Sequence, residues 1–245
     1  MWYGVDLHIH TVLSACADWE MTPKNIVKKA KEVGLKIIAI TDHNTTKNVK
    51  PCIKLGEREG ILVIPGIEIQ TQEEVHIIAL FPSERNAKEF ERWLQDRLPK
   101  AKNDEDLFGI QVVVDEEDNV IEIDERLLQT SAKASVEEIA LKARDYEGIA
   151  YPAHMDREFG SIISVLGFIP PEFPFKVGEL SYHADLILFL EKHPELKDYV
   201  ILISSDAHFL SSIKGARTVV DLVEISPASL IKAIQDKRRV KTCLS

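Results

Sequence analysis

Histidines in this chain occur at spacings that suit metal binding. His8 and His10 are two residues apart in the segment DLHIHTVLSACADWE, residues 6 to 20, which begins as a predicted β-strand. Successive side chains of a strand point to opposite faces, so the two imidazoles share one face and can bind one ion. A histidine on a buried strand is more often a hydrogen-bonded core residue than a ligand, so an isolated H-x-H pair is weak evidence for a metal. The other histidines decide between these two interpretations.

Most of the remaining histidines also fall at the ends of predicted strands. The histidines at strand ends are His8, His10, His43, His154 and His208, and Glu68, His76 and Asp206 lie close to strand ends as well. Histidines that fill a core would not gather in this way. The carboxyl ends of the strands in an α/β barrel face one mouth, which is where active sites of that architecture lie. The pattern therefore predicts one metal centre at that mouth.

The residue types indicate which ions this centre would bind. Imidazole and carboxylate together suit Zn, Mn or Fe, whereas Ca and Mg prefer shells of oxygen ligands. A single catalytic zinc uses three protein ligands and keeps one position open. Six histidines together with Glu68, Asp206 and a carboxylate at Asp18 exceed that number. We therefore predict two or three divalent transition-metal ions in a bridged cluster.

Predicted strands and helices alternate along most of the chain and would position these ligands. Thr22 and Pro23 are typical of a helix start, and Gly34 of a helix stop. About seven strand–helix units in one chain indicate a mostly parallel sheet closed into a barrel. Residues 100–131 break the rhythm with a predicted β-hairpin that turns at DEEDN. We predict one domain over residues 1–245, with residues 100–131 as an insertion in it.

Composition limits the classes of partner. The formal charge of −10 opposes binding to a phosphate backbone, and no basic stripe with interleaved aromatics is evident, so we expect a small phosphorylated substrate and no nucleic-acid polymer. The three cysteines have no C-x-x-C spacing, which argues against a disulfide framework or a zinc ribbon. No apolar run approaches a membrane span and the N-terminus does not read as a signal peptide, so we expect a cytoplasmic protein without a membrane partner. The sequence indicates no oligomeric state.

The motifs together resemble the PHP domain, a phosphoesterase family named after polymerase and histidinol phosphatase members. DLHIHTVLSACAD resembles its first motif, ITDHN its second, GIEI with EVHIIAL its third, YPAH a later single-histidine motif and SSDAH its fourth. The match spans residues 5 to 208 in the order of the family. The resemblance implies an α/β fold, a distorted (β/α)7 TIM-like barrel with a trinuclear metal site.

The resemblance also implies how the ligands divide among three ions. The first ion would take His8, His10, Glu68 and Asp206, the second Asp18, His43 and His208, and the third Glu68, His76 and His154. Glu68 would bridge the first and third ions. Among these ligands Glu68, Asp206 and His208 are the residues that we expect to act in catalysis.

One position departs from the family pattern. Members commonly carry an acid or a histidine about five residues after the second histidine of the first motif, where this chain has Ala15. We assign the ligand to Asp18, across an apparent insertion, with Glu20 or no protein ligand as the alternatives. Cys16 lies close by and is a packed or free thiol, or else a soft ligand.

The expected reaction is hydrolysis of a phosphate monoester of a nucleotide or small metabolite. A hydroxide bridging two ions would attack the phosphoryl group, and the ions would neutralise charge on its oxygens. The predicted substrate contacts are Arg157, His183 and Arg217, with Lys47 as a further candidate cation. We expect Asp42, and less strongly Asp156 and Glu179, to orient ligands by hydrogen bonds.

Three other functions fit parts of the pattern. A PHP-type exonuclease or phosphodiesterase would use the same metal ligands to cleave a phosphodiester at the end of a nucleic-acid strand. A non-catalytic metal-binding regulatory module would keep the fold without turnover. A metal-dependent amidohydrolase would require a bridging carboxylated lysine, and the sequence has no lysine at a predicted strand end that suits this role.

Overall fold

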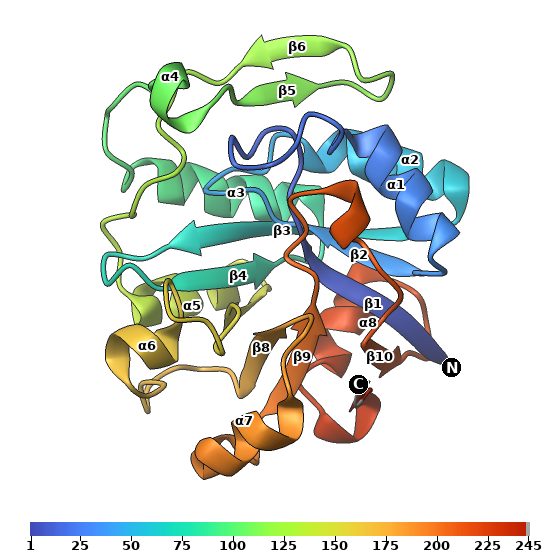
Figure 1. Ribbon diagram of the computed structural model, residues 1–245, viewed down its shortest axis with the longest axis vertical. Helices are drawn as coiled ribbons and strands as arrows, with labels where there is room; N and C mark the ends of the chain where they lie inside the picture. The colour runs from blue at the N-terminus through green and yellow to red at the C-terminus, as the bar shows by residue number, and fades with distance from the viewer. Residues whose placement is uncertain (244–245) are drawn as a thin grey trace.

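The computed structural model describes residues 1–243, in which helices surround a mixed β-sheet (Figure 1). The strands of this sheet, in spatial order, are β11 (Val240–Thr242), β10 (Thr218–Asp221), β1 (Trp2–Ile9), β2 (Ile37–Ile40), β3 (Leu62–Gln70), β4 (His76–Leu80) and β7 (Ile149–Pro152). Two more strands, β8 (Val177–Ser181) and β9 (Val200–Ser204), form a parallel pair beside it. A bridge from Ile9 to Ala207 joins the chain after β9 to the end of β1.

The structure confirms the α/β class, but the strand pairing differs from the expected mostly parallel barrel. The pairs β1–β2 and β2–β3 are parallel. The pairs β3–β4, β4–β7, β1–β10 and β10–β11 are antiparallel. Only residues 71–75 connect β3 to β4, and so short a link makes a hairpin because a parallel crossover needs a dozen or more residues.

Helices cover both faces of the sheet. They are α1 (Pro23–Glu32), α2 (Val49–Glu59), α3 (Glu84–Gln95), α5 (Val136–Asp145), α6 (Ile162–Leu166), α7 (Leu186–Lys192) and α8 (Pro227–Ala233). Strand β2 shows the two-sided burial, since Ile38 and Ile40 pack with α1 and α2 while Ile37 and Ala39 join the core that includes α3, α5 and α8. Such strands read as continuous apolar runs because neither face meets water.

The predicted start of α1 is confirmed. Thr22 is the N-cap, its hydroxyl accepts a hydrogen bond from the backbone N–H of Asn25, and Pro23 is the first helical residue. Proline suits that position because its missing N–H would have no partner within the helix. This cap therefore fixes the point at which the loop after β1 ends and α1 begins.

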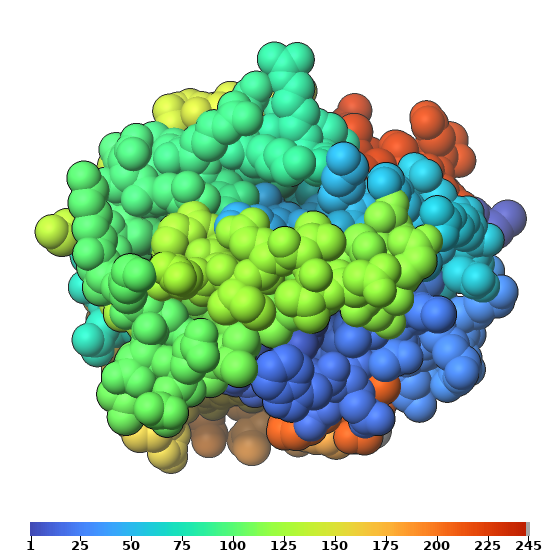
Figure 2. All heavy atoms as spheres, turned by 90° about the horizontal axis from the view of Figure 1, so that it is seen from above, coloured from blue at the N-terminus to red at the C-terminus, as the bar shows by residue number. Residues whose placement is uncertain are grey.

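Residues 100–131, here called the 100–131 segment, lie outside the sheet. They contain the short helix α4 (Glu105–Phe108) and the antiparallel strands β5 (Val112–Val114) and β6 (Val120–Ile123). Val112 and Val114 pack against Val12 in the loop after β1. In the view from above, the yellow-green part of the segment lies across the blue N-terminal loop and the cyan region (Figure 2).

Within residues 1–243, no helix combines the length and the apolar character that crossing a bilayer requires.

Candidate metal centre

Glu68 lies at the middle of a buried cluster of imidazoles. Its side chain is 2% exposed, and its two carboxylate oxygens lie 3.0 to 3.4 Å from ring nitrogens of five histidines. These five are His8, His10, His43, His76 and His154. They reach Glu68 from the ends of β1, β2 and β7 and from the start of β4, so the sheet topology brings distant parts of the sequence to one carboxylate.

Three groups of potential ligands share this centre. They are His8, His10, Glu68 and Asp206; Glu68, His76 and His154; and His10, His43 and His208. In each group the ligand atoms lie within 4.8 Å of one another. Two groups contain the same residues as the family resemblance implies for the first and third ions. In the remaining group His10 stands where Asp18 was expected.

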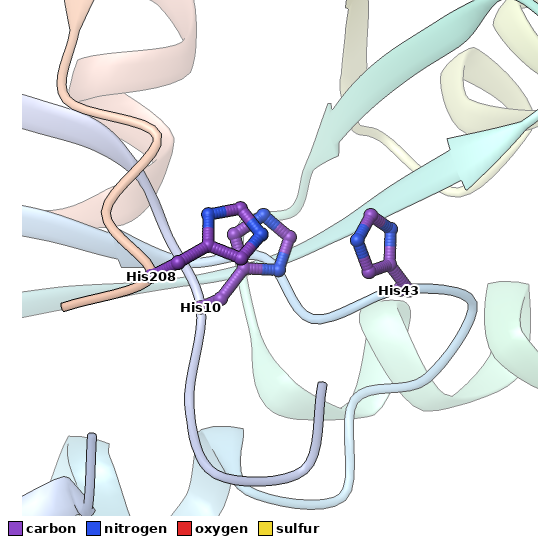
Figure 3. Close-up of side chains that lie close together, drawn as sticks. All are labelled: His10, His43 and His208. Carbon is purple, nitrogen blue, oxygen red and sulfur yellow. The ribbon is translucent and has the colours of Figure 1, made fainter. Parts of the chain in front are cut away.

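The group of three histidines comes from three different strand ends. The ring centroid of His10 lies 4.2 Å from that of His208 and 4.6 Å from that of His43. Figure 3 shows the His10 and His208 rings overlapping in the view, with the His43 ring beside them. His10 therefore belongs to two of the three groups, as Glu68 does.

The donor set fits transition-metal ions. The Nε2 atoms of His8 and His10 lie 3.1 Å apart, close to the roughly 3.3 Å between two imidazole ligands on one tetrahedral zinc. Asp206 Oδ1 is buried without a hydrogen-bond partner and lies 3.1 and 3.2 Å from the same two nitrogens. Buried polar atoms are normally paired, so an oxygen facing two imidazole nitrogens marks a position where a cation would satisfy all three.

Hydrogen bonds on the far side of two rings fix which nitrogen faces the centre. His8 Nδ1 lies 2.8 Å from Glu179 Oε1 and donates a hydrogen bond to this oxygen. His10 Nδ1 lies 3.0 Å from Ser14 Oγ, and that hydroxyl donates to Asp42 Oδ1 at 2.7 Å. Both rings therefore present Nε2 inward, as ligating histidines do when their other nitrogen is held by a hydrogen bond.

The cluster shifts the ionisation of its members in opposite directions. Burial acts to lower the pKa of His10, but the Asp206 and Glu68 carboxylates outweigh it and bring that pKa to about 9. Burial, together with the charge of His10, lowers the pKa of His208 to about 4. Burial also places the pKa of His43 well below its usual range. An ion bound here would have to displace a proton from His10 at neutral pH, whereas the rings of His43 and His208 would be available as neutral ligands.

Two members of the cluster have unfavourable backbone conformations. His154 and Asp206 have φ angles of +28° and +48°. Residues other than glycine rarely adopt positive φ, and such strain persists only where surrounding contacts hold it, most often at functional sites. The turns after β7 and β9 are thus held in place to carry these two side chains.

Asp18 and Cys16 lie outside all three groups. Asp18 Oδ1 accepts a hydrogen bond from the Glu20 backbone, and the Asp18 N–H donates to the carbonyl of His208. Cys16 is exposed. The loop after β1 therefore contacts the His208 turn through its backbone, and the local Asx turn uses the carboxylate that was expected to bind a metal.

The predicted substrate contacts occupy different environments. Arg157 is next to the centre, with Nη1 2.6 Å from Asp206 Oδ2 and Nε donating to Ser181 Oγ. His183 is exposed, and its Nε2 accepts from Lys214 at 3.3 Å. Arg217 is instead 8% exposed and donates to the carbonyls of residues 182, 184 and 243, so its guanidinium supports the fold. Lys47 pairs with Asp124 of the 100–131 segment.

The orienting residues were predicted only in part. Glu179 contacts the ligand His8 directly, Asp42 reaches His10 only through the Ser14 hydroxyl, and Asp156 accepts from the Ser181 N–H instead of from a ligand. Ser14 was not identified from the sequence. Its signal was weak because a serine four residues after a histidine is common in loops.

Comparison with known proteins gives one family. The PHP domain model matches residues 6–226. A 5'-3' exoribonuclease of Escherichia coli is 40% identical over 80 residues, which are 31% of this chain and 26% of that protein. A phosphoribosyl 1,2-cyclic phosphate 1,2-diphosphodiesterase of Eggerthella lenta is 34% identical over 80 residues, 31% of this chain and 29% of that protein.

A solved structure has the same fold over nearly the whole chain. The lesion-specific endonuclease Q of Pyrococcus furiosus superimposes with a TM-score of 0.65 at 20% identity, covering 96% of this chain and 56% of that one. This chain therefore spans less than two thirds of each of the three proteins compared.

These similarities overturn one expectation from composition. The net charge of −10 was taken as evidence against a nucleic-acid substrate, but proteins with these motifs or this fold include an exoribonuclease and an endonuclease. Net charge describes the whole surface, whereas a local site and its cations decide which anion binds. Since the family model covers most of the sequence and the matching residues converge on Glu68, the chain belongs to the PHP domain family.

Proposed function

We propose that this chain is a metal-dependent phosphoesterase that hydrolyses phosphate monoesters. The observation that carries the proposal is the buried Glu68 carboxylate within 3.4 Å of five imidazoles, in a chain of the PHP family. This number of nitrogen and oxygen donors exceeds what one ion needs. Divalent ions bound here would lower the pKa of water and neutralise charge on a phosphoryl group.

The chain's own residues would do the positioning. Glu179 and Ser14 hold His8 and His10 with Nε2 inward, so the ligands are in place before an ion arrives. Arg157 contacts Asp206 at the edge of the centre and can turn its remaining N–H groups to phosphoryl oxygens. No protein nucleophile is required. Glu68 belongs to two of the three ligand groups and would hold the position between them, where an amidohydrolase of the kind considered would need a carboxylated lysine.

The second candidate function is cleavage of a phosphodiester at the end of a nucleic-acid strand. It is favoured by two adjoining cavities beside the centre, which share Asp156, Arg157 and Glu158 in their walls. Space beyond the position of the phosphoryl group would accept a second nucleotide. The same ligands would serve both reactions, so the substrate has to be determined by assay.

The test is hydrolysis of paired substrates by protein reconstituted separately with Zn, Mn and Fe. Phosphate release from nucleoside monophosphates and cleavage of bis(p-nitrophenyl) phosphate would be compared in wild type, His10→Ala and Asp206→Ala. Asp198→Ala, an exposed carboxylate away from the centre, is the matched control. We expect monoester turnover in wild type and the control only.

A protein that binds its ions in stoichiometric amounts but hydrolyses neither class of ester would contradict the proposal. The regulatory metal-binding module would then be the better interpretation. Turnover of the diester alone would replace the first candidate with the second.

A further inference from the structure

A cavity of about 840 Å³ opens next to the metal centre and has no assigned role. Its walls include two members of the centre, His76 and His154, and also Arg157, Phe159, Gln70 and Glu74. Sites for small molecules range from about 300 to 1,000 Å³. A molecule whose phosphate lies at the centre would therefore place its remaining part in this cavity.

The backbone next to Phe159 is held against the metal centre through Gly160. The Gly160 carbonyl accepts a hydrogen bond from the His76 N–H at 2.7 Å. Gly160 has φ of +68°, and a Cβ there would lie 3.1 Å from Cδ2 of the His76 ring. The backbone thus lies directly against the imidazole, and Phe159 is attached one residue before this contact.

Phe159 contributes little to the folded core, because it is 84% exposed. Single exposed apolar residues are common, so exposure alone proves nothing. This ring, however, lines the cavity at the metal centre, where an aromatic face would stack on a planar ligand.

The same cavity is also lined by polar groups without partners. Within residues 1–243, the side chains of Gln70 and Glu74 make no hydrogen bond or ion pair with the protein. Thr71 holds the tight turn between β3 and β4, since its hydroxyl accepts from the N–H groups of Glu73 and Val75. Glu74 has φ of +66° in this turn, an unusual conformation for glutamate.

We propose that this cavity binds the base of a nucleotide, with Phe159 stacked on the base and Gln70 and Glu74 contacting its edge. The inference rests on the proposed phosphoesterase function for the position of the phosphate. An amide offers both a donor and an acceptor, and a carboxylate accepts from exocyclic amines, so the two groups suit base edges. A sugar phosphate without a base would leave the aromatic wall unused.

Two sources can supply the same base. It is either a free nucleotide or the terminal nucleotide of a strand, and the adjoining cavity beyond Arg157 would hold the next residue of a strand. A comparison of AMP with a 5'-phosphorylated adenylyl dinucleotide distinguishes the two.

The first measurement does not depend on turnover. The fluorescence of 2-aminopurine riboside 5'-monophosphate falls when the base stacks, so the probe is titrated with wild type, Phe159→Ala, Phe159→Trp and Phe168→Ala. Phe168 is 55% exposed, lines neither cavity and serves as the matched control. We expect Phe159→Ala to weaken probe binding about tenfold, which is the usual loss when an aromatic side chain that stacks on a base is removed. Binding should persist in Phe159→Trp and in Phe168→Ala.

The second measurement is kcat/KM for AMP, the dinucleotide and ribose 5-phosphate. We expect Phe159→Ala to lower the value for both base-containing substrates and to leave ribose 5-phosphate unchanged. Equal values for AMP and ribose 5-phosphate, unaffected by Phe159→Ala, would overturn the base site while the phosphoesterase stands. Loss of probe binding in Phe159→Ala without any turnover would support the base site and contradict the proposed reaction.

Discussion

The two flanks of the metal centre differ in how firmly they are held. On the flank of β1 and β2, the loops that carry His10 and His43 contact the 100–131 segment. On the flank of β7, the chain after His154 is exposed at residues 156–159 and lines two cavities. The first flank therefore fixes ligands and the second is accessible to a substrate.

Asn48 shows how the covered flank is held. It is 0% exposed, and its Nδ2 donates to Thr11 Oγ1 at 2.9 Å and to the Val112 carbonyl at 3.0 Å. Its Oδ1 accepts from the Val114 N–H at 3.0 Å. Asn44, one residue after His43, donates to the carbonyls of residues 128 and 130. One buried network thus joins the metal-binding loops to a distant part of the sequence.

The two flanks therefore separate the positioning of the metal ligands from the recognition of the substrate. Ligand positions tolerate little movement, so they occur where buried amides hold the backbone. Substrate groups vary, and the residues beside them are exposed and make few internal contacts. Substitutions on the two flanks should therefore affect different quantities.

The largest expected effect comes from removing ligands on each flank. His10 belongs to two of the three ligand groups and His76 to one. We expect His10→Ala to lower phosphate release by about 10³-fold and His76→Ala by about 10²-fold, since each removes electrostatic stabilisation from a shared site. The metal content of the two variants is measured on the same samples as their activity, and it should fall further in His10→Ala than in His76→Ala. Equal losses of metal and activity in the two variants would show that the three groups do not represent separate ions.

The next largest effect concerns stability. Asn48→Ala removes three buried hydrogen bonds, those with Thr11 Oγ1, the Val112 carbonyl and the Val114 N–H, and we expect it to lower the free energy of unfolding by about 2–4 kcal/mol. Phe159→Ala on the open flank should change it by less than about 0.5 kcal/mol, because the ring is exposed. Urea denaturation of both variants measures the difference. Similar destabilisation by the two substitutions would remove the distinction between the flanks.

The sequence predicted the centre better than its surroundings. The histidines of H-x-H, TDH and SDAH lie at strand ends, and the ends of adjacent strands meet whatever the loops do. Asp18 was assigned by counting along a loop, where a local turn determines the side-chain direction. Arg217 was predicted to contact substrate because it follows the SDAH motif in the sequence. Its hydrogen-bond partners are instead backbone carbonyls of residues far away in the sequence.

The fold was predictable to the same extent. Apolar runs and helix caps give the α/β class, since each depends on neighbouring residues. The strand directions were not recoverable from alternation alone, although the short link between β3 and β4 indicates a hairpin. The packing of the 100–131 segment depends on contacts such as that between Asn48 and Val112, which are 64 residues apart and carry no local pattern.

A smaller effect tests the residues that orient ligands. Glu179 accepts from His8 Nδ1, and we expect Glu179→Ala to weaken metal binding about 10- to 100-fold. Glu179→Gln keeps an acceptor oxygen and should recover part of that loss. Metal affinity is measured by competition with a chelating dye. If both variants bind metal as tightly as wild type, the hydrogen bond does not orient His8.

The smallest expected effect is the pH dependence of the covered flank. Asp124 of the 100–131 segment is 2% exposed and binds Arg126 and Lys47. Burial acts to raise its pKa, but these two cations outweigh it and lower the pKa to about 2. Because this value is below the usual 3.8 of an unfolded chain, the ionised carboxylate stabilises the fold above about pH 4, and this contribution is lost as the pH falls toward 2. We expect Asp124→Asn to cost about 1 kcal/mol at pH 7 and progressively less between pH 4 and pH 2.

Asp236 provides the matched control, because it makes the same pair with an arginine two residues later on an exposed surface. Its substitution by asparagine should change the urea midpoint less at pH 7, since solvent screens an exposed pair. A loss in Asp124→Asn that persists unchanged at pH 3 would mean that packing, and not the charge, joins the 100–131 segment to the loop after β2. The covered flank would then be held by its buried amides alone, through the hydrogen bonds that Asn44 and Asn48 make to the 100–131 segment.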